Sequence, residues 1–430
     1  MQNIEYNEFT SKRNKLNRGA YTAQCTFDYF ISLLVSDAFL AKLVKSMGVS
    51  DSLTGIISSL ISLAFVFQLA AIPLVQHLRN TKRASIILST ASQLLFTGLY
   101  IIPFLKLSRT MNTALVFSLL MLAYFAHYII LGTVFKWCNS FVDPQKRGRF
   151  TSFKEMVSLF TGMIFTVAIG DTFDKFEAAG QINNGFLFIA ITMITLSIMN
   201  FISLMMVQKE EMPKQEAKPF KEVIHNITRN RNFIYIVIMI VIWDTARFMT
   251  IGFLGTFKTQ ELMLTVGAVQ LINIVSNICR LGISIPFGKY SDKHSYVKGM
   301  KLGYTIAALA FLINSFTTPS TWWLIIIYTV LLSVSSAGTV ANNFNIMYNY
   351  LPTEYYVQAN AIKSSIAGLC GFGASLVGSK ILQFVQENGN MLFGIHVYGQ
   401  QVLSFISFIM IVILIIFVRL TLEKQKTIVQ

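Results

Sequence analysis

Charged residues are scarce in this chain. Asp, Glu, Lys and Arg make up 13% of its 430 residues, about half of the roughly 25% that is usual in soluble domains. The longest polar stretch, residues 208–232, is too short to form a folded domain of its own. The scarcity of charge therefore excludes a soluble globular protein, and it leaves no extramembrane domain of the kind that a receptor needs.

Residues that carry covalent or metal chemistry are also few. The chain has 4 cysteines and 5 histidines, all dispersed singly, so neither a disulfide framework nor a cysteine metal site can be read from it. No nucleophile motif, glycine-rich phosphate loop or paired metal-ligand spacing is present. We therefore expect a protein that is not an enzyme and uses no cofactor and no metal.

What the chain has in excess is apolar sequence. Hydrophobic residues make up 54% of it, and its mean hydropathy is +0.58. A run of about 18 apolar residues is long enough to cross the hydrocarbon core of a bilayer as a helix, and helices satisfy their own backbone polar groups there. The sequence predicts an all-α membrane protein with twelve transmembrane helices, at about residues 20–44, 52–75, 84–105, 112–138, 150–170, 185–207, 233–256, 264–287, 298–316, 321–349, 357–384 and 395–420.

Basic residues predict the orientation, since cytoplasmic loops of membrane proteins are enriched in Lys and Arg. With the N-terminus inside, 23 of the 35 Lys and Arg residues fall in cytoplasmic segments and 7 in outer segments. Both termini are therefore predicted to be cytoplasmic. The net charge of +15 then faces anionic lipid and does not indicate nucleic-acid binding.

The predicted spans fall into two sets of six. Residues 1–207 are expected to form one six-helix bundle, residues 208–232 a cytoplasmic linker, and residues 233–430 a second six-helix bundle. Loops at matching places indicate an internal duplication. In each half, a proline is followed ten or eleven residues later by a lysine near the start of the fifth span, Lys154 in the first half and Lys363 in the second.

A short motif between the eighth and ninth predicted spans has a wider meaning. Gly288-Lys-Tyr-Ser-Asp292-Lys293 is similar to the glycine–acid–base loop of the major facilitator superfamily, and with the two sets of six spans the resemblance covers essentially the whole chain. It implies two bundles around a central cavity that opens alternately to each side, with the solute near the midplane. By this resemblance Gly288, Asp292 and Lys293 form a cytoplasmic gating loop, although the matching loop of the first half lacks the acid.

Two charges stand in the middle of the seventh span. Asp244 and Arg247 are three residues apart, so they share one face of a helix and can form an ion pair. Ionisable groups at this depth are costly unless they are paired or face water. One interpretation is a purely structural pair. In the other, both residues face the cavity and bind the solute, Asp244 also serves as a coupling acid, and either residue can exchange its partner for Arg280.

The eighth span carries a polar stripe. Gln270, Asn273, Asn277 and Arg280 recur at spacings that put them on one helical face. Hydrogen bonding between packed helices is one explanation, and a cavity lining that binds the solute is the one that we favour. Three further residues complete the predicted solute site: Asn342, Asn345 and Lys363.

Asp28 is the first candidate for a coupling acid, because it lies several residues inside the first span, where a carboxyl group loses hydration. Lys154, near the inner end of the fifth span, is expected instead to extend its ammonium group to the lipid interface.

Together these features predict a secondary active transporter of the plasma (inner) membrane of a bacterium. Carboxamides and a positive excess suit a sugar, a glycoside or a small organic anion, moved by symport with a proton or a sodium ion. The alternative is a drug/proton antiporter, but the Gly-Pro signature usual in the fifth span of such proteins is missing. The expected partners are the solute, the coupling ion and the lipid bilayer, and the chain is expected to act as a monomer.

Overall fold

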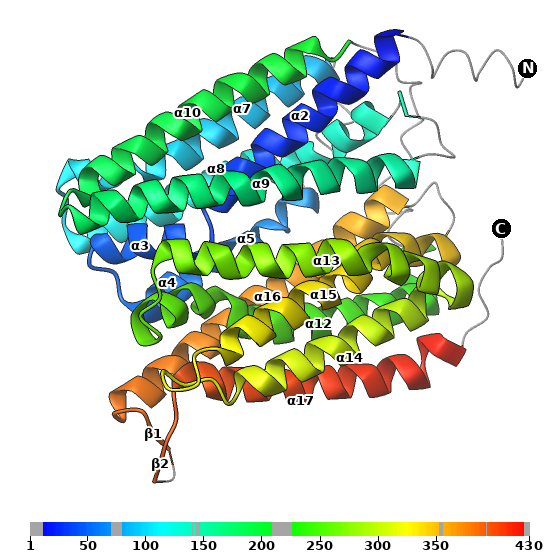
Figure 1. Ribbon diagram of the computed structural model, residues 1–430. Coiled ribbons are helices and arrows are strands. Elements are labelled where there is room, and N and C mark those ends of the chain that lie inside the picture. Colours follow the sequence, from blue (N-terminus) through cyan, green and yellow to red (C-terminus); the bar gives the residue numbers. More distant parts are fainter. Residues whose placement is uncertain are drawn as a thin grey trace, which may run out of the picture. The chain divides into compact units, whose positions relative to one another are not determined.

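The computed structural model describes residues 12–69, 80–139, 141–142, 147–208, 226–351, 356–392 and 394–424. These residues are almost entirely helical (Figure 1). They divide into two units: unit 1 contains Met1–Gly48 and Ala70–Ala217, and unit 2 contains Val49–Leu69 and Lys218–Gln430. The predicted all-α membrane fold is confirmed, whereas the count of twelve spans, the side on which the termini lie and the limits of the predicted bundles stay predictions.

Unit 1 is built from long apolar helices that pack side by side, with α2 against α9 and α10, and α7 against α8 and α10. Its aromatic residues make up much of the buried interior, including the fully buried Trp137, Tyr100 and Phe186. The elements are α2 (Lys12–Leu34), α3 (Asp37–Ser46), α7 (Thr81–Leu99), the 3-10 helix η1 (Ile102–Leu105), α8 (Arg109–Asn139), α9 (Arg147–Ala178) and α10 (Ile182–Met206).

The first predicted span is broken in the structure. Helix α2 ends at Leu34 and α3 begins at Asp37, because Ser36 adopts extended backbone angles between them. The carbonyl group of Leu34, which has no partner within the helix, accepts a hydrogen bond from the hydroxyl group of Tyr100, which follows α7. The span predicted at residues 20–44 is therefore divided between two helices, and a polar side chain from outside them satisfies the backbone at the break.

Unit 2 contains residues 49–69 and all the described helices of the second half of the chain. Within it α12 packs against α16 and α17, and α15 packs against α13 and α14. The elements are α4 (Asp51–Ser58), α5 (Leu60–Ala64), α12 (Arg231–Thr256), the π-helix η3 (Phe257–Glu261), α13 (Val266–His294), α14 (Tyr296–Asn314), α15 (Leu324–Asn345), η4 (Ile346–Asn349), α16 (Tyr356–Glu387), the short hairpin β1 (Met391–Leu392) and β2 (Ile395–His396), α17 (Gly399–Leu420) and η6 (Leu422–Lys424).

The predicted gating loop is helical. Helix α13 continues through Pro286 to His294, and Ser295 alone separates it from α14. The backbone of Ser295 is extended, and its hydroxyl oxygen accepts a hydrogen bond from the backbone N–H of Lys298, which caps the start of α14. A single capping serine thus makes the turn between α13 and α14. The prediction of a loop over residues 288–297 is therefore wrong.

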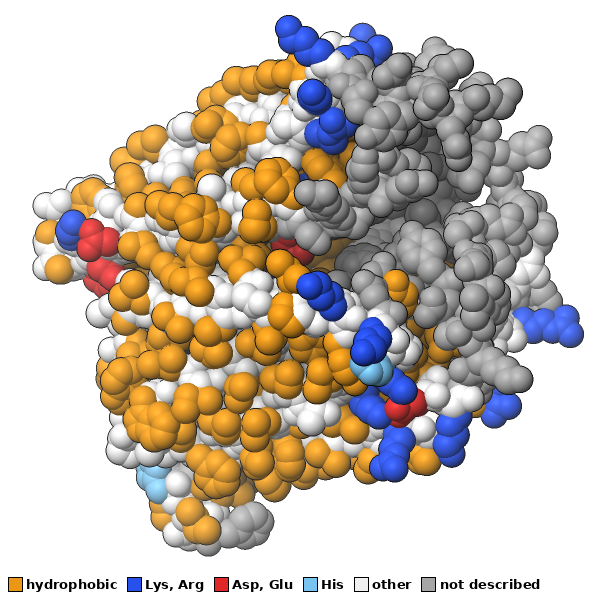
Figure 2. Space-filling model, turned by 45° about the vertical axis from the view of Figure 1, so that its right-hand side comes forward, with side chains coloured by type: hydrophobic (Ala, Val, Ile, Leu, Met, Phe, Trp, Pro, Cys, Tyr) orange, Lys and Arg blue, Asp and Glu red, His pale blue; other side chains and the backbone are white. Residues whose placement is uncertain are grey.

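Nine helices among the described residues are long and apolar enough to cross a membrane. Apolar side chains also cover much of the surface. Figure 2 shows them spread over much of the visible face. Large exposed residues such as Ile164, Ile198 and Ile285 suit contact with lipid, because apolar patches of this extent are rare on soluble proteins.

Glycines bring residues 49–69 into close contact with α12 and α16 in unit 2. A Cβ atom on Gly252 of α12 would lie 2.7 Å from the carbonyl oxygen of Gly55 on α4. A Cβ atom on Gly368 of α16 would lie 2.2 Å from the carbonyl oxygen of Ser62 on α5. Both distances are too short for any side chain, so the backbones touch. We call this contact the glycine seam, made by Gly55, Gly252 and Gly368.

Gly368→Ala is expected to destabilise the protein, because its new methyl group meets backbone atoms of α5 that cannot rotate away. Overpacking of this kind costs about 1–3 kcal/mol. Gly373→Ala on the same helix is the matched control, since nothing lies within 4 Å of a Cβ atom there. Thermal unfolding in detergent measures both, and the control should be neutral or slightly stabilising because alanine favours helix. Equal melting temperatures for the two variants would contradict the close contact.

Candidate substrate and coupling sites

A pair of opposite charges lies inside unit 2 on α12. An Nη atom of Arg247 is 3.5 Å from a carboxylate oxygen of Asp244, and the side chains are 28% and 10% exposed. The guanidinium group also lies over the ring of Phe248, with its central carbon 4.7 Å from the ring centroid. The spacing of three residues did bring the two charges together, as the sequence predicted.

Lys363 of α16 adds a second cation to this pair. It is only 1% exposed, and its ammonium group donates hydrogen bonds to two oxygen atoms of Asn343 on α15, at 3.1 Å to the backbone carbonyl and 2.8 Å to the side chain. Asp244 interacts electrostatically with both Lys363 and Arg247. We call these three residues the charge cluster: Asp244, Arg247 and Lys363.

Aromatic and small residues enclose the charge cluster. Tyr304 of α14 is fully buried, interacts electrostatically with Asp244 and packs against the ring of Trp243 at 5.1 Å between centroids. On α16, Gly371 leaves room for the ring of Phe248 on α12, since a Cβ atom there would lie 2.7 Å from Cδ2 of that ring. The cluster is thus held by residues of α12, α14, α15 and α16 and lies one to two turns from the glycine seam along α12.

The polar stripe of α13 is present but is not part of the charge cluster. Gln270 is buried and accepts a hydrogen bond of 3.4 Å from Asn273, and Asn277 and Arg280 are half-buried. The predicted exchange of Arg247 for Arg280 as the partner of Asp244 stays a prediction. That the stripe lines a cavity stays a prediction.

The remaining predicted residues of unit 2 lie toward the ends of α13 and α15. Asn342 is buried and donates a hydrogen bond of 2.8 Å to Ser291, so its amide joins α15 to α13. Gly288 and Lys293 are exposed on the last turns of α13. The side chains of Asn345 and Asp292 lie outside the described part of the chain, and the gating and binding roles of these residues stay predictions.

Unit 1 holds the predicted coupling acid. Asp28 of α2 is half-buried, and one of its carboxylate oxygens accepts a hydrogen bond of 3.2 Å from the amide of Gln93 on α7. The partner is neutral, so this bond holds the carboxyl group in place without compensating its charge. Sequence reasoning missed Gln93, although a lone amide within an apolar stretch is a signal that could have found it.

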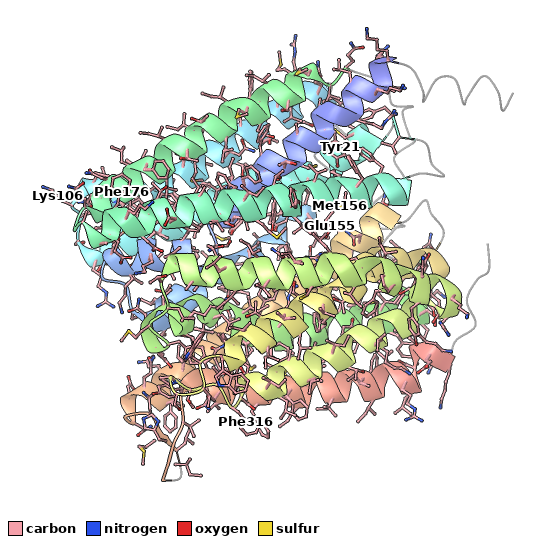
Figure 3. The ribbon with its side chains drawn as sticks, viewed as in Figure 1. Tyr21, Lys106, Glu155, Met156, Phe176 and Phe316 are labelled. Atoms are coloured by element: carbon pink, nitrogen blue, oxygen red, sulfur yellow. The ribbon has the colours of Figure 1, made fainter. Side chains whose placement is uncertain are left out.

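Lys154 points into unit 1. Its ammonium group donates a hydrogen bond of 3.2 Å to the hydroxyl oxygen of Tyr21 on α2 and lies 4.4 Å from the centroid of that ring. Its chain neighbours Glu155 and Met156, labelled in Figure 3 together with Tyr21, are exposed. The prediction that Lys154 reaches the lipid interface is therefore wrong, because an aromatic ring and a hydroxyl group supply a closer partner.

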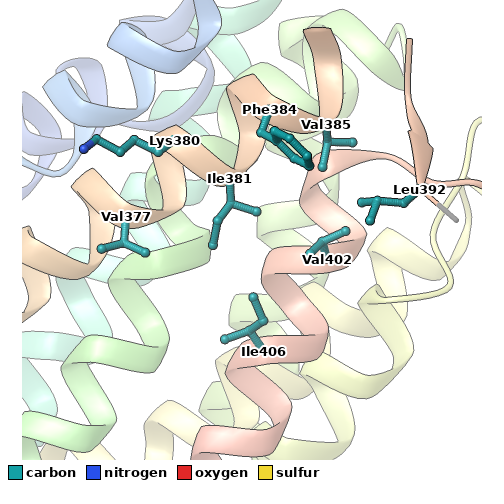
Figure 4. Close-up of a pocket in the computed structure, with 8 residues that line it drawn as sticks. All are labelled: Val377, Lys380, Ile381, Phe384, Val385, Leu392, Val402 and Ile406. Atoms are coloured by element: carbon teal, nitrogen blue, oxygen red, sulfur yellow. The ribbon is translucent and has the colours of Figure 1, made fainter. Parts of the chain in front are cut away.

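An apolar pocket of about 410 Å³ lies near the C-terminal end of α16. Figure 4 shows it between α16, α17 and the first strand of the hairpin. Lys380 lines it together with seven apolar residues, so it has no group of converging polar atoms with which to orient a polar solute. The candidate site for such a solute is the charge cluster.

Long apolar helices with ionisable groups buried between them define a multi-pass membrane protein, and comparison gives its family. The sequence pattern of the Major Facilitator Superfamily matches residues 22–374, so the chain belongs to this superfamily. It is accordingly a secondary transporter and not an enzyme. No curated sequence matches the chain.

Solved structures of several transporters share the fold. The nucleoside transporter NupG has a TM-score of 0.67 at 12% identity, over 97% of this chain and 100% of its own. A D-xylose–proton symporter has a TM-score of 0.69 at 13% identity, over 94% and 96%. A bacterial homologue of the human lysosomal transporter Spinster, in an inward-facing and unoccupied conformation, has a TM-score of 0.68 at 13% identity, over 96% and 97%. Identities this low support a common fold and nothing finer.

We expect variants at the arginine and at the acid of the charge cluster to differ in their free energy of unfolding. Arg247→Gln leaves Asp244 beside Lys363, a balanced pair, so we expect a loss of about 1 kcal/mol or less. Asp244→Asn leaves two cations together and should cost about 3–5 kcal/mol, as when one partner of a buried ion pair is removed. Melting temperatures of the purified variants measure the difference.

Transport by the double variant, Asp244→Asn with Arg247→Gln, separates the two interpretations of the pair. If the pair binds solute, the double variant should be folded and inactive. A double variant that transports at the wild-type rate would make the pair purely structural.

Proposed function

We propose that this protein is a symporter that moves a small polar solute, a sugar, a glycoside or an organic anion, into the cell with a proton or a sodium ion. The observation that carries the proposal is that the chain has both kinds of site: a half-buried acid in unit 1, Asp28, and a cluster of ionisable groups in unit 2. Symport needs a group that changes charge and a group that holds the solute, and both kinds lie among apolar helices. The protein acts in the plasma membrane of a bacterium, as a monomer.

The solute site of the proposal is the charge cluster. Arg247 is the most exposed of its members, at 28%, so it is the group that a solute reaches first. Hydroxyl and carboxylate oxygens are good acceptors for its guanidinium group. Gln270, Asn273, Asn277 and Arg280 of the α13 stripe, with Asn342 and Asn345 of α15, would supply further hydrogen bonds.

The coupling site of the proposal is Asp28. A carboxylate with one neutral hydrogen-bond partner among apolar helices gains by binding a proton or a cation, because its charge is then neutralised. A change of conformation that moves the Asp28 carboxyl group among apolar helices costs less free energy when that group is neutral than when it is charged. The amide of Gln93, 3.2 Å from Asp28, keeps the acid oriented in both states. Asp244 is the second candidate for the coupling role.

Alternating access requires that contacts which cover a site come apart. In unit 2, α4 and α5 lie against α12 and α16 at the glycine seam. The hydroxyl groups of Ser52 on α4 and Ser379 on α16 form a further hydrogen bond of 2.6 Å there. Opening on that side would separate α4 and α5 from these two helices. The fold of the D-xylose–proton symporter, similar to that of this chain, agrees with this type of mechanism.

Asp28→Asn is expected to abolish gradient-driven accumulation and to leave solute exchange intact, because the amide cannot take up a proton while the solute site is unchanged. The measurement is uptake into proteoliposomes with and without an imposed proton or sodium gradient. The solute is first identified by a thermal-shift screen of the purified protein against sugars and organic acids.

Asp171→Asn is the matched control. Asp171 forms an exposed ion pair of 2.6 Å with Lys175 on α9, and exposed pairs contribute little, so accumulation should be normal. Undiminished accumulation by Asp28→Asn would reject Asp28 as the coupling acid and point to Asp244. Energised export of lipophilic cations by the wild type would instead support drug/proton antiport.

A further inference from the structure

One buried hydroxyl group of unit 2 has a hydrogen-bonding capacity that this structure does not use. Tyr304 of α14 is 0% exposed, and its hydroxyl group has no hydrogen-bond partner among the described residues. Buried tyrosines usually find a partner for this group, because a buried polar group without a hydrogen bond raises the free energy of the fold. Such a group needs a physical explanation, and a second state in which the bond is made supplies one.

The side chain of Tyr304 reaches α12 beside Asp244. Its ring lies 5.1 Å from the ring of Trp243, between centroids, with an angle of 43° between the two planes, and Trp243 directly precedes Asp244 in the chain. Asp244 acts electrostatically on the phenol group. A neutral donor and a buried carboxylate are therefore neighbours in apolar surroundings, where a hydrogen bond to a charged group is strong.

The carboxylate of Asp244 can accept a further hydrogen bond. A carboxylate offers about four acceptor positions on its two oxygens. The contact with Arg247 involves one oxygen at 3.5 Å, which is longer than the roughly 2.7–2.9 Å of a strong bond between a cation and a carboxylate. The contact with Arg247 is therefore one that the acid can exchange for another donor.

The proposed function requires Asp244 to change its partner. When Arg247 binds a solute, its guanidinium group leaves the acid, and a buried carboxylate that loses a partner is strongly destabilised. Lys363 acts electrostatically on Asp244 as well, while its ammonium group donates hydrogen bonds to Asn343. A hydroxyl donor beside the acid would lower the cost of releasing Arg247 without adding a charge.

We infer that Tyr304 is the alternative hydrogen-bond donor for Asp244: its hydroxyl group binds the carboxylate when Arg247 turns from the acid to the solute, and releases it when Arg247 returns. The ring of Tyr304 is held by its packing on Trp243, so the carboxylate is the group that turns. Tyr304 is a positioning residue, because it acts on the solute through Asp244. The inference rests on the proposed function and adds a switch to its solute site.

A double-mutant cycle of melting temperatures tests the switch without any solute. Arg247→Gln removes the guanidinium group and so leaves Asp244 as solute binding would leave it. Tyr304→Phe should leave the melting temperature of the wild type unchanged or slightly higher, because the hydroxyl group that it removes forms no bond there. In the Arg247→Gln background the same change should lower the melting temperature by about 3–6 °C, since it then breaks a hydrogen bond to a charged group. The measurement is thermal unfolding of the purified full-length protein in detergent.

Two further measurements support the cycle. Arg247→Met, which also removes the charge and keeps a long side chain, is a second background and should give the same difference. Infrared difference spectra of Tyr304→Phe against its parent protein report the bond directly, because the C–O stretch of a tyrosine shifts when its hydroxyl group donates a hydrogen bond. We expect the bonded band in the Arg247→Gln background and the unbonded band in the wild type.

Tyr100→Phe is the matched control. Tyr100 of unit 1 is also 0% exposed, but its hydroxyl group already donates a hydrogen bond to the carbonyl group of Leu34, so its loss should lower the melting temperature equally in both backgrounds. The inference is overturned if Tyr304→Phe lowers the melting temperature equally in both backgrounds, more in the wild type, or in neither. Since no solute enters the cycle, such a result rejects the role of Tyr304 alone. The solute site is judged separately, by transport of the double variant Asp244→Asn with Arg247→Gln.

Discussion

A charge placed between apolar helices needs a partner, because neither lipid nor hydrocarbon side chains can solvate it. This constraint explains the interior of both units. The carboxylate of Asp28 is bound by an amide, the ammonium group of Lys154 by a tyrosine, and that of Lys363 by the oxygens of an asparagine. The carboxylate of Asp244 lies within ion-pair distance of Arg247. These hydrogen bonds to neutral groups hold the side chains of Asp28, Lys154 and Lys363 in place.

The two halves of the chain follow the same arrangement. The first helix of each half carries an aromatic residue followed by an acid, Phe27 before Asp28 and Trp243 before Asp244. The fifth helix of each half carries a lysine that points into its own unit, Lys154 toward Tyr21 and Lys363 toward Asn343. An ancestral duplication would leave equivalent acids and bases in each half. In the proposed mechanism the copies have since diverged, one toward coupling and one toward solute binding.

The sequence predicted the structural features that depend on residues close together along the chain. Long apolar runs gave the helices, and a spacing of three residues gave the contact between Asp244 and Arg247, since both depend on neighbours along one helix. Features that depend on distant residues were missed. The break before Asp37 is supported by Tyr100, more than sixty residues away, and Lys154 turns inward because Tyr21 of another helix lies within reach. The turn at Ser295 was predicted wrongly for a different reason. Charged residues such as those at the end of α13 are typical of a loop, but a helix that ends in water can also carry them.

The glycine seam has a consequence for how the transporter responds to its surroundings. The described contacts of α4 and α5 with α12 and α16 consist of backbone, hydroxyl and aromatic groups, with no ion pair among them. Van der Waals contact is indifferent to dissolved ions, whereas exposed charges are screened within about 10 Å at 0.1 M salt. The contribution of these described contacts to the stability of the seam should therefore be the same in dilute and in concentrated salt. In the proposed mechanism, the close backbone contacts at Gly55, Gly252 and Gly368, which salt does not screen, would therefore contribute equally to the cost of opening at any salt concentration.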